Sequence, residues 1–253
     1  MKAGLVQFSP KWEAPEKNIE VIEMLIGGCS TKYDIIIFPE LTLTGFTMNS
    51  IKYAEDLAGI SHTYFMKLAS RIKTNIFAGL IEYDDNKIFN SLVHFDEFGL
   101  VHARYRKVHP FSMSNENRYY SAGDELVITD VNRTKIGLSI CYDLRFPELY
   151  RLYAKEKVDV MINIANWPVT RIEHWKTLLK ARAIEIQFYM IGVNRTGDDP
   201  QYHYCGATAV FDPLGNEKIM ADDRVGIFEV ELNLDEVDRV RTDLPFLNDM
   251  KLI

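Results

Sequence analysis

Short apolar runs alternate with amphipathic stretches along almost the whole chain, and their spacing indicates which segments form strands and which form helices. Apolar side chains at helical spacing predict helices over residues 15–27, 60–73 and 171–187 and from Pro147, with a short helix and an extended end after Asn233. β-rich runs bounded by turn residues predict the strands. These strands cover residues 2–8, 34–38, 75–82, 88–95, a run ending near 106, 125–130, 135–140, 158–164, 188–194, 205–211, 216–220 and 225–231.

Strands and helices follow one another with no linker, internal repeat or low-complexity segment between them. This order is typical of an α/β protein, so we expect one domain over residues 1–253. About five helices and roughly ten or more strands imply either one large mixed sheet or two sheets packed together under helical layers.

Composition and charge restrict the partners that we expect. The chain has 47% apolar and 26% charged residues, which is typical of a soluble globular protein. Its formal charge of −7 has the wrong sign for a surface that neutralises phosphates, so we expect no nucleic-acid partner. The longest run without a charged residue, 200–211, is shorter than the roughly 20 residues of a membrane span. Residues 1–8 read as a strand rather than a signal peptide, and we therefore expect no membrane partner and a cytoplasmic location.

The chain contains three cysteines, Cys29, Cys141 and Cys205. Their odd number and unrelated spacings, without a C-x-x-C pair, indicate neither a disulfide framework nor a structural zinc site. We therefore expect no metal. Each thiol has to be interpreted from its own neighbours, and a buried cysteine is most often a small core hydrophobe. That interpretation applies to Cys29 and Cys205.

Cys141 has different neighbours. It follows the apolar strand at 135–140 and precedes the helix that begins at Pro147, and charged residues stand directly after it. A thiol near helix amides is expected to ionise more easily than the reference pKa of about 8.5 implies, and the thiolate is the nucleophile. Cys141 is therefore our candidate nucleophile, with the small core hydrophobe as the alternative.

Two further reactive side chains follow predicted strands. Glu40 comes after the apolar run at 35–38, and Lys107 comes after the strand that ends near 106. Open α/β sheets bind ligands at the carboxyl ends of their strands. A thiol that attacks a carbonyl carbon needs a base and a donor for the oxyanion, and Glu40 and Lys107 can fill these roles. The alternatives are an ordinary helix- or loop-start carboxylate for Glu40 and a solvated basic run, 104–107, for Lys107.

Three segments carry a family resemblance: residues 38–40, 105–111 and 141–148. In order and spacing they resemble the signature segments of the nitrilase superfamily of carbon-nitrogen hydrolases, and the resemblance extends over essentially the whole chain. It implies that Glu40 is the general base, Lys107 the oxyanion stabiliser and Cys141 the nucleophile. It also implies a four-layer αββα sandwich, a reaction without cofactor or metal, and a homodimer paired through helices.

Members of this superfamily place a second glutamate near the site, after the lysine. Glu116, within the segment 111–117, is the better match, and the resemblance implies that it orients the lysine and the substrate amide. Glu125 is the competing candidate because it also follows the lysine.

Four other segments, 116–123, 165–168, 181–185 and 194–197, resemble the bacterial omega-amidase branch. Members of that branch hydrolyse the terminal amide of 2-oxoglutaramate and 2-oxosuccinamate. The resemblance therefore implies an amidohydrolase that cleaves a small dicarboxylic acid monoamide through a cysteine thioester and releases ammonia. Another amidase, a nitrilase or an N-carbamoyl amidohydrolase of the same superfamily is the alternative, and a non-catalytic binding protein is a further one.

A dicarboxylic monoamide would require a cation for its free carboxylate as well as a site for the amide. Arg145 is the candidate cation, and an ion pair with Asp143 or Glu148 is its alternative role. We expect Trp167 either to wall the pocket or to be an aromatic core residue. The backbone N–H of Tyr142 is the second expected oxyanion donor.

Overall fold

Two six-stranded sheets form the centre of the computed structural model, which describes residues 1–251. One sheet contains, in spatial order, β14 (Gly226–Glu231), β1 (Lys2–Gln7), β2 (Ile35–Ile37), β3 (Asn75–Asp84), β4 (Lys87–Phe95) and β5 (Val101–Arg106). The other contains β13 (Glu217–Met220), β12 (Ala209–Phe211), β9 (Tyr189–Asn194), β8 (Val160–Ala165), β7 (Thr134–Ile140) and β6 (Ile128–Val131). In each sheet three neighbouring strands run parallel, β1–β2–β3 and β9–β8–β7, and antiparallel pairs flank them.

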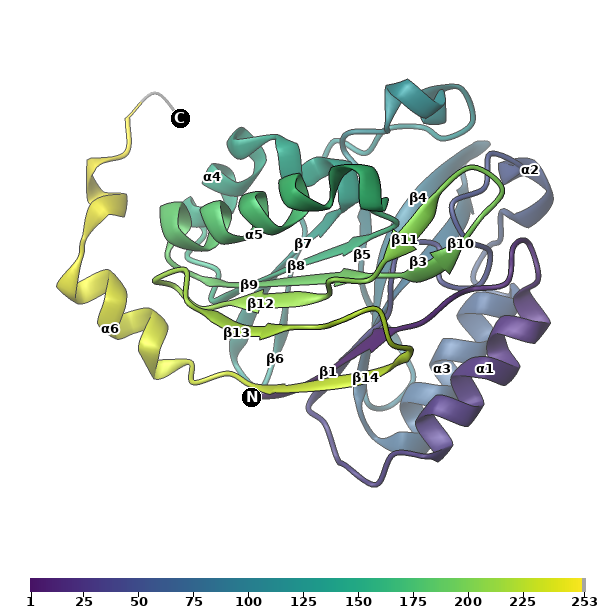
Figure 1. Cartoon of the computed structure of the whole chain (residues 1–253), viewed down its shortest axis with the longest axis horizontal. Helices are drawn as coiled ribbons and strands as arrows, with labels where there is room; N and C mark the ends of the chain where they lie inside the picture. The colour runs from purple at the N-terminus through teal and green to yellow at the C-terminus, as the bar shows by residue number, and fades with distance from the viewer. Residues whose placement is uncertain (252–253) are drawn as a thin grey trace.

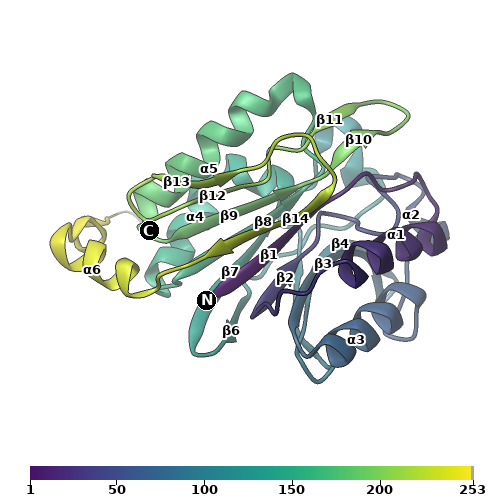
Figure 2. The same ribbon diagram turned by 60° about the horizontal axis from the view of Figure 1, so that its bottom comes forward.

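Helices cover the outer face of each sheet (Figures 1 and 2). Helices α1 (Pro15–Gly27) and α3 (Ile60–Ile72) lie on the first sheet, and α4 (Pro147–Lys155) and α5 (Ile172–Ile186) lie on the second. The order of layers is therefore helix, sheet, sheet, helix, which confirms the predicted four-layer αββα sandwich.

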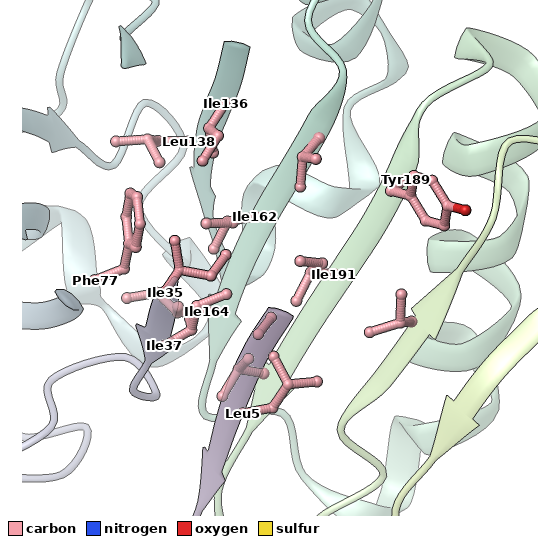
Figure 3. Close-up of a cluster of buried hydrophobic side chains, with 14 of the residues drawn as sticks. Leu5, Ile35, Ile37, Phe77, Ile136, Leu138, Ile162, Ile164, Tyr189 and Ile191 are labelled. Carbon is pink, nitrogen blue, oxygen red and sulfur yellow. The ribbon is translucent and has the colours of Figure 1, made fainter. Parts of the chain in front are cut away.

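The core lies between the two sheets (Figure 3). Ile35 and Ile37 of β2 point into this layer, where Ile162 of β8 also lies. Ile36, between them, joins the separate cluster beneath α1 and α3, because successive side chains of a strand point to opposite faces. Burial on both faces explains why this strand is a continuous apolar run rather than an alternating one.

Most predicted elements are confirmed to within a few residues, but one strand is wrong. The predicted strand at 205–211 is two strands, β11 (His203–Cys205) and β12. Gly206 and Ala207 have φ values of +71° and +60° between them, and left-handed backbone breaks an extended strand. β11 instead pairs with β10 (Thr196–Asp198), a strand that the sequence pattern did not indicate, in a hairpin beyond the ends of β9 and β12 (Figure 1).

The C-terminal segment leaves the sandwich after β14. Its predicted short helix is α6 (Asp235–Asp243), and a 3₁₀ turn, Phe246–Asp249, follows. Residues 252–253, the last of the predicted extended end, lie outside the described residues. Within residues 1–251, no helix combines the length and the apolar character needed to cross a lipid bilayer.

Candidate active site

Cys141 lies immediately after β7, at the start of a 3₁₀ turn (Cys141–Arg145). The parallel register places Ile140 opposite Ile164, so Cys141 follows β7 at the point where β8 also ends. Its φ of +47° is in the left-handed region, which is strained for a residue with a β-carbon. The surrounding contacts must therefore hold this turn in place.

Asp143 provides that support. Its buried carboxylate accepts hydrogen bonds from the backbone N–H of Ile140 at 2.9 Å, the backbone N–H of His109 at 2.9 Å and the hydroxyl of Tyr105 at 2.8 Å. The ring Nδ1 of His109 lies 2.8 Å from the same carboxylate, and the ring stacks on Phe146. Asp143 thus joins the end of β7 to the segment that follows β5.

Glu40 follows β2 in a loop that lies directly on β3. A β-carbon at Gly79 would come within 2.4 Å of the backbone N of Leu41 and 2.7 Å of the Cα of Glu40, so this approach requires glycine. Backbone hydrogen bonding between Thr42 and Gly79 fixes the loop there. The side chain of Glu40 therefore lies inside the sandwich, where it is 0% exposed.

Only donors contact the carboxylate of Glu40. Lys107 Nζ and Asn90 Nδ2 donate to one oxygen, at 2.8 Å and 2.7 Å. The backbone N–H and Nδ2 of Asn166 donate to the other, at 2.8 Å and 3.2 Å. A buried carboxylate bound in this way is fixed in position as an acceptor.

Lys107, which directly follows β5, lies between Glu40 and Glu116. Its Nζ is 2.8 Å from Glu40 Oε1 and 3.0 Å from Glu116 Oε2, and all three side chains are buried. Burial by itself lowers the pKa of an ammonium, but the two carboxylates outweigh it and hold the pKa of Lys107 well above its usual value. Burial raises the pKa of Glu116, and the ammonium opposes that shift only in part.

The structure brings Glu116, and not Glu125, to the lysine. Glu116 stands in a 3₁₀ turn (Glu116–Arg118), and its carboxylate accepts hydrogen bonds from Asn90 Nδ2 and from the backbone N–H of Phe111. Glu125 is exposed and lines a separate surface hollow with Arg106. The segment after the lysine motif therefore supplies the second carboxylate.

The pKa of Cys141 differs from the prediction. Burial raises the pKa of the thiol well above its usual value, and the negative charge of Glu40 adds to this, while Lys107 opposes it. The prediction of an easily ionised thiol was wrong. Burial by the pocket walls takes away the solvent that would stabilise a thiolate, and nearby amides and the ammonium of Lys107 do not make up for this loss. A thiol with a raised pKa needs a base before it can act as a nucleophile.

This pKa predicts how alkylation of Cys141 depends on pH. Because the thiolate reacts, the rate with iodoacetamide should keep rising from about pH 7 to beyond about pH 9. Trypsin releases residues 136–145 as a peptide with Cys141 as its single cysteine, so mass spectrometry can follow this site separately from the other thiols. A plateau below about pH 8 would contradict the assignment of a protonated resting thiol.

Cys141 faces a pocket that encloses about 390 Å³ of space, part of it open to solvent. Six aromatic side chains line it: Phe46, Phe111, Tyr142, Trp167, Tyr202 and Tyr204. Asn166, Arg145 and Arg171 supply the polar and charged groups of the lining. Aromatic walls with a few polar and charged groups among them are typical of a site for a small organic molecule.

Arg145 and Trp167 both line this pocket. Arg145 makes no ion pair with Asp143 or Glu148, so that alternative for it was wrong; its guanidinium lies 4.7 Å from the centre of the Trp167 ring instead. Trp167 combines both of its expected roles, because it is 2% exposed and packs on Trp175 as well.

Sequence reasoning missed three polar residues of the site. Asn90 donates to both glutamates, Asn166 donates to Glu40, and Arg171 lines the pocket. Asn90 is a polar residue within an otherwise mostly apolar strand, and Asn166 directly follows one, so both carried a usable signal. Arg171 is the first residue of the helix predicted over 171–187 and carried none.

Proteins bind metal ions through clusters of histidine, cysteine, aspartate or glutamate side chains. Within the described part of the chain, no three or more histidine, cysteine, aspartate or glutamate side chains are arranged so that they could hold a metal ion.

Known proteins resemble this chain in sequence and in fold. A family profile described as carbon-nitrogen hydrolase matches residues 2–242. Two proteins named 2-oxoglutaramate amidase are similar. One, from Bacillus subtilis, is 32% identical over 97% of this chain and 96% of its own length. The other, from Paenarthrobacter nicotinovorans, is 35% identical over 94% of this chain and 85% of its own length. A CN-hydrolase superfamily protein from Xanthomonas campestris, solved with an arsenic adduct in its active site, superposes with a TM-score of 0.94 at 29% identity, covering 100% of this chain and 98% of that one.

Proposed function

Since this chain belongs to the carbon-nitrogen hydrolase family, whose amidases cleave carbon-nitrogen bonds other than peptide bonds, we propose that it hydrolyses the terminal amide of a small dicarboxylic acid monoamide. 2-Oxoglutaramate and 2-oxosuccinamate are the proposed substrates. In this proposal the reaction passes through a thioester on Cys141 and releases ammonia.

One observation carries the proposal: Lys107 is held between Glu40 and Glu116 in a buried interior that borders a half-buried cysteine. A buried ammonium with two buried carboxylates is expensive to maintain for stability alone. Its value lies in chemistry, because a fixed cation in a low-dielectric site stabilises negative charge that develops on a substrate oxygen.

The first half of the reaction acylates the enzyme. Glu40 takes the proton of the Cys141 thiol as Sγ adds to the amide carbon. Lys107 Nζ and the backbone N–H of Tyr142 hold the resulting oxyanion. Glu40 then passes the proton to the amide nitrogen, the carbon-nitrogen bond breaks, and ammonia leaves while the acyl group remains on sulfur as a thioester.

The second half releases the acid. Glu40 takes a proton from water as the water oxygen adds to the thioester carbon, and the same donors hold the oxyanion. The carbon-sulfur bond then breaks, and Glu40 returns the proton to the leaving sulfur. The free acid departs, and the Cys141 thiol and the Glu40 carboxylate are restored.

The lining of the pocket supports an acidic substrate without an ammonium group. Among the described residues, it contains Arg145 and Arg171 but neither aspartate nor glutamate. A free carboxylate therefore finds cations there, whereas the α-ammonium of glutamine or asparagine finds no carboxylate partner. The names of the similar amidases point to the same class of substrate.

Ammonia release tests this proposal. We expect rapid release from 2-oxoglutaramate and little or none from L-glutamine, L-asparagine, a simple nitrile or an N-carbamoyl amino acid. Preferred turnover of a nitrile or an N-carbamoyl substrate would assign the chain to another activity of the family. No release from any member of the panel, with no acyl group on Cys141 by intact-mass measurement, would contradict the proposed function.

The proposed role of Glu116 is tested by its replacement with glutamine. Glu116→Gln should lower kcat/KM by roughly 10²-fold, because Lys107 loses one of the charges that orient it. Iodoacetamide should still alkylate Cys141 in this variant. The matched control is Glu125→Gln, which changes an exposed glutamate outside the site and should leave the rate unchanged. A normal rate for Glu116→Gln would show that Glu116 takes no part in catalysis.

The proposal also includes the organisation of the enzyme. We propose that residues 1–253 form one domain, and the continuous family match over residues 2–242 supports this. We propose a homodimer paired through helices, for which Ile184 of α5, 43% exposed, offers an apolar contact. A cytoplasmic location fits the three cysteines, which are all free thiols.

A further inference from the structure

Two arginines from different elements line the pocket of Cys141. Arg145 ends the 3₁₀ turn that Cys141 begins, and Arg171 ends another 3₁₀ turn (Val169–Arg171) just before α5. The guanidinium carbon of Arg145 lies 4.7 Å from the centre of the Trp167 ring. That of Arg171 lies 5.5 Å from the centre of the Phe111 ring. Aromatic walls therefore hold both planar cations.

Neither guanidinium has an anionic partner within residues 1–251. Two other arginines of the chain do: Arg106 pairs with Glu82, and Arg182 pairs with Glu185. The carboxylates of Glu40 and Glu116 contact Lys107 and make no ion pair with either pocket arginine. Both arginines line the same pocket, and burial together with the charge of Arg171 lowers the pKa of Arg145.

Partly buried like charges without a counter-ion are unfavourable, and an anion in the pocket would relieve them. Arginine is well suited to a carboxylate, since its planar N–H groups match the two oxygens. Trp167 also fixes the Arg171 turn directly, because its indole N–H donates to the backbone carbonyl of Arg171 at 2.8 Å. The wall that holds Arg145 therefore also positions Arg171.

We propose that Arg145 and Arg171 form a clamp that binds the free carboxylate of the substrate, and that Arg171 is a specificity-determining residue of the enzyme. This inference rests on the proposed function, since it assigns the end of the substrate that lies away from the scissile amide. Arg171 enters from the segment before α5, whereas the nucleophile and Arg145 come from the turn after β7. The clamp thus joins two elements across the pocket.

The test replaces Arg171 by methionine, which keeps an apolar stem against Phe111 and Tyr202 and removes the charge. KM for 2-oxoglutaramate should rise about 10- to 100-fold with kcat changed less than about threefold, because the clamp binds ground state and transition state alike. Arg171→Lys should recover part of the loss. The matched control is Arg71→Met, which removes an exposed arginine on α3 and should change neither constant.

A second readout does not depend on turnover. Glutarate carries two carboxylates and no amide, and it should protect Cys141 of the wild type from iodoacetamide. Arg171→Met should need at least about tenfold more glutarate for the same protection, while its unprotected alkylation rate stays normal. If glutarate protects Cys141 of the wild type but the wild type hydrolyses no amide, the proposed function is contradicted and the clamp is still supported. Unchanged KM and protection in Arg171→Met, or a loss of kcat alone, would overturn the clamp.

Discussion

Cys141→Ala is expected to reduce amide hydrolysis by at least about 10⁴-fold, because the proposed mechanism forms its acyl intermediate on the Cys141 thiol. Among the residues that line the pocket, Cys141 carries the sole thiol. Ammonia release measures the loss, and intact-mass spectrometry after mixing with substrate measures the thioester, which should form in the wild type and be absent in the variant.

The fold should survive this change. Alanine keeps the β-carbon, so the left-handed φ of +47° is no more strained than with cysteine, and Asp143 still holds the turn. Circular dichroism and the melting temperature should therefore match those of the wild type. Cys29→Ala and Cys205→Ala are the matched controls, since both remove a partly buried thiol elsewhere and should leave the rate intact. Residual activity above about 1% in Cys141→Ala would contradict the nucleophile assignment.

Sequence patterns predicted the parts of the fold that depend on residues close together in the chain. Helix α1 begins at Pro15 and ends at Gly27, as predicted, because proline favours the first turn and the apolar spacing continues to that point. The rule that reactive residues follow parallel strands led to Glu40 and Cys141, which the structure places at the ends of β2 and β7. Their proximity was implied by the family resemblance and required the two sheets to pack.

The features that the sequence did not predict depend on contacts between residues far apart in the chain. The pKa of Cys141 depends on pocket walls that come from distant parts of the chain, so its neighbours in sequence suggested the wrong direction. The β10–β11 hairpin depends on the left-handed Gly206 and Ala207, and alanine gives no sequence signal for that conformation. Arg171 becomes informative only when its neighbours Phe111 and Tyr202 are known.

Glu40→Gln is expected to lower kcat by about 10³-fold, because the proposed mechanism uses this carboxylate to move a proton in both halves of the reaction. It should also reduce stability. The four contacts of the carboxylate are all donors, so a glutamine amide group would face N–H groups of Lys107, Asn90 or Asn166. An unsatisfied buried donor costs about 1–3 kcal/mol, which would lower the melting temperature by roughly 2–4 °C per kcal/mol.

A matched control separates the loss of stability from the loss of the base. Glu82 is as deeply buried as Glu40, at 1% exposed, and it accepts hydrogen bonds from Arg104 and Arg106 outside the pocket. Glu82→Gln should therefore lower the melting temperature while kcat stays near that of the wild type. If both variants lost activity in proportion to their stability, Glu40 would be a structural residue rather than the base.

An activated substrate shows which step Glu40 serves. In a p-nitrophenyl ester of the substrate acid, the leaving group needs no proton, so at alkaline pH, where the thiolate forms without a base, Glu40→Gln should still be acylated on Cys141. Hydrolysis of the thioester still requires a proton to be taken from water. The acyl-enzyme should therefore accumulate in Glu40→Gln and be visible by intact-mass spectrometry, whereas in the wild type it should turn over. Rapid deacylation of Glu40→Gln would show that another group activates the water.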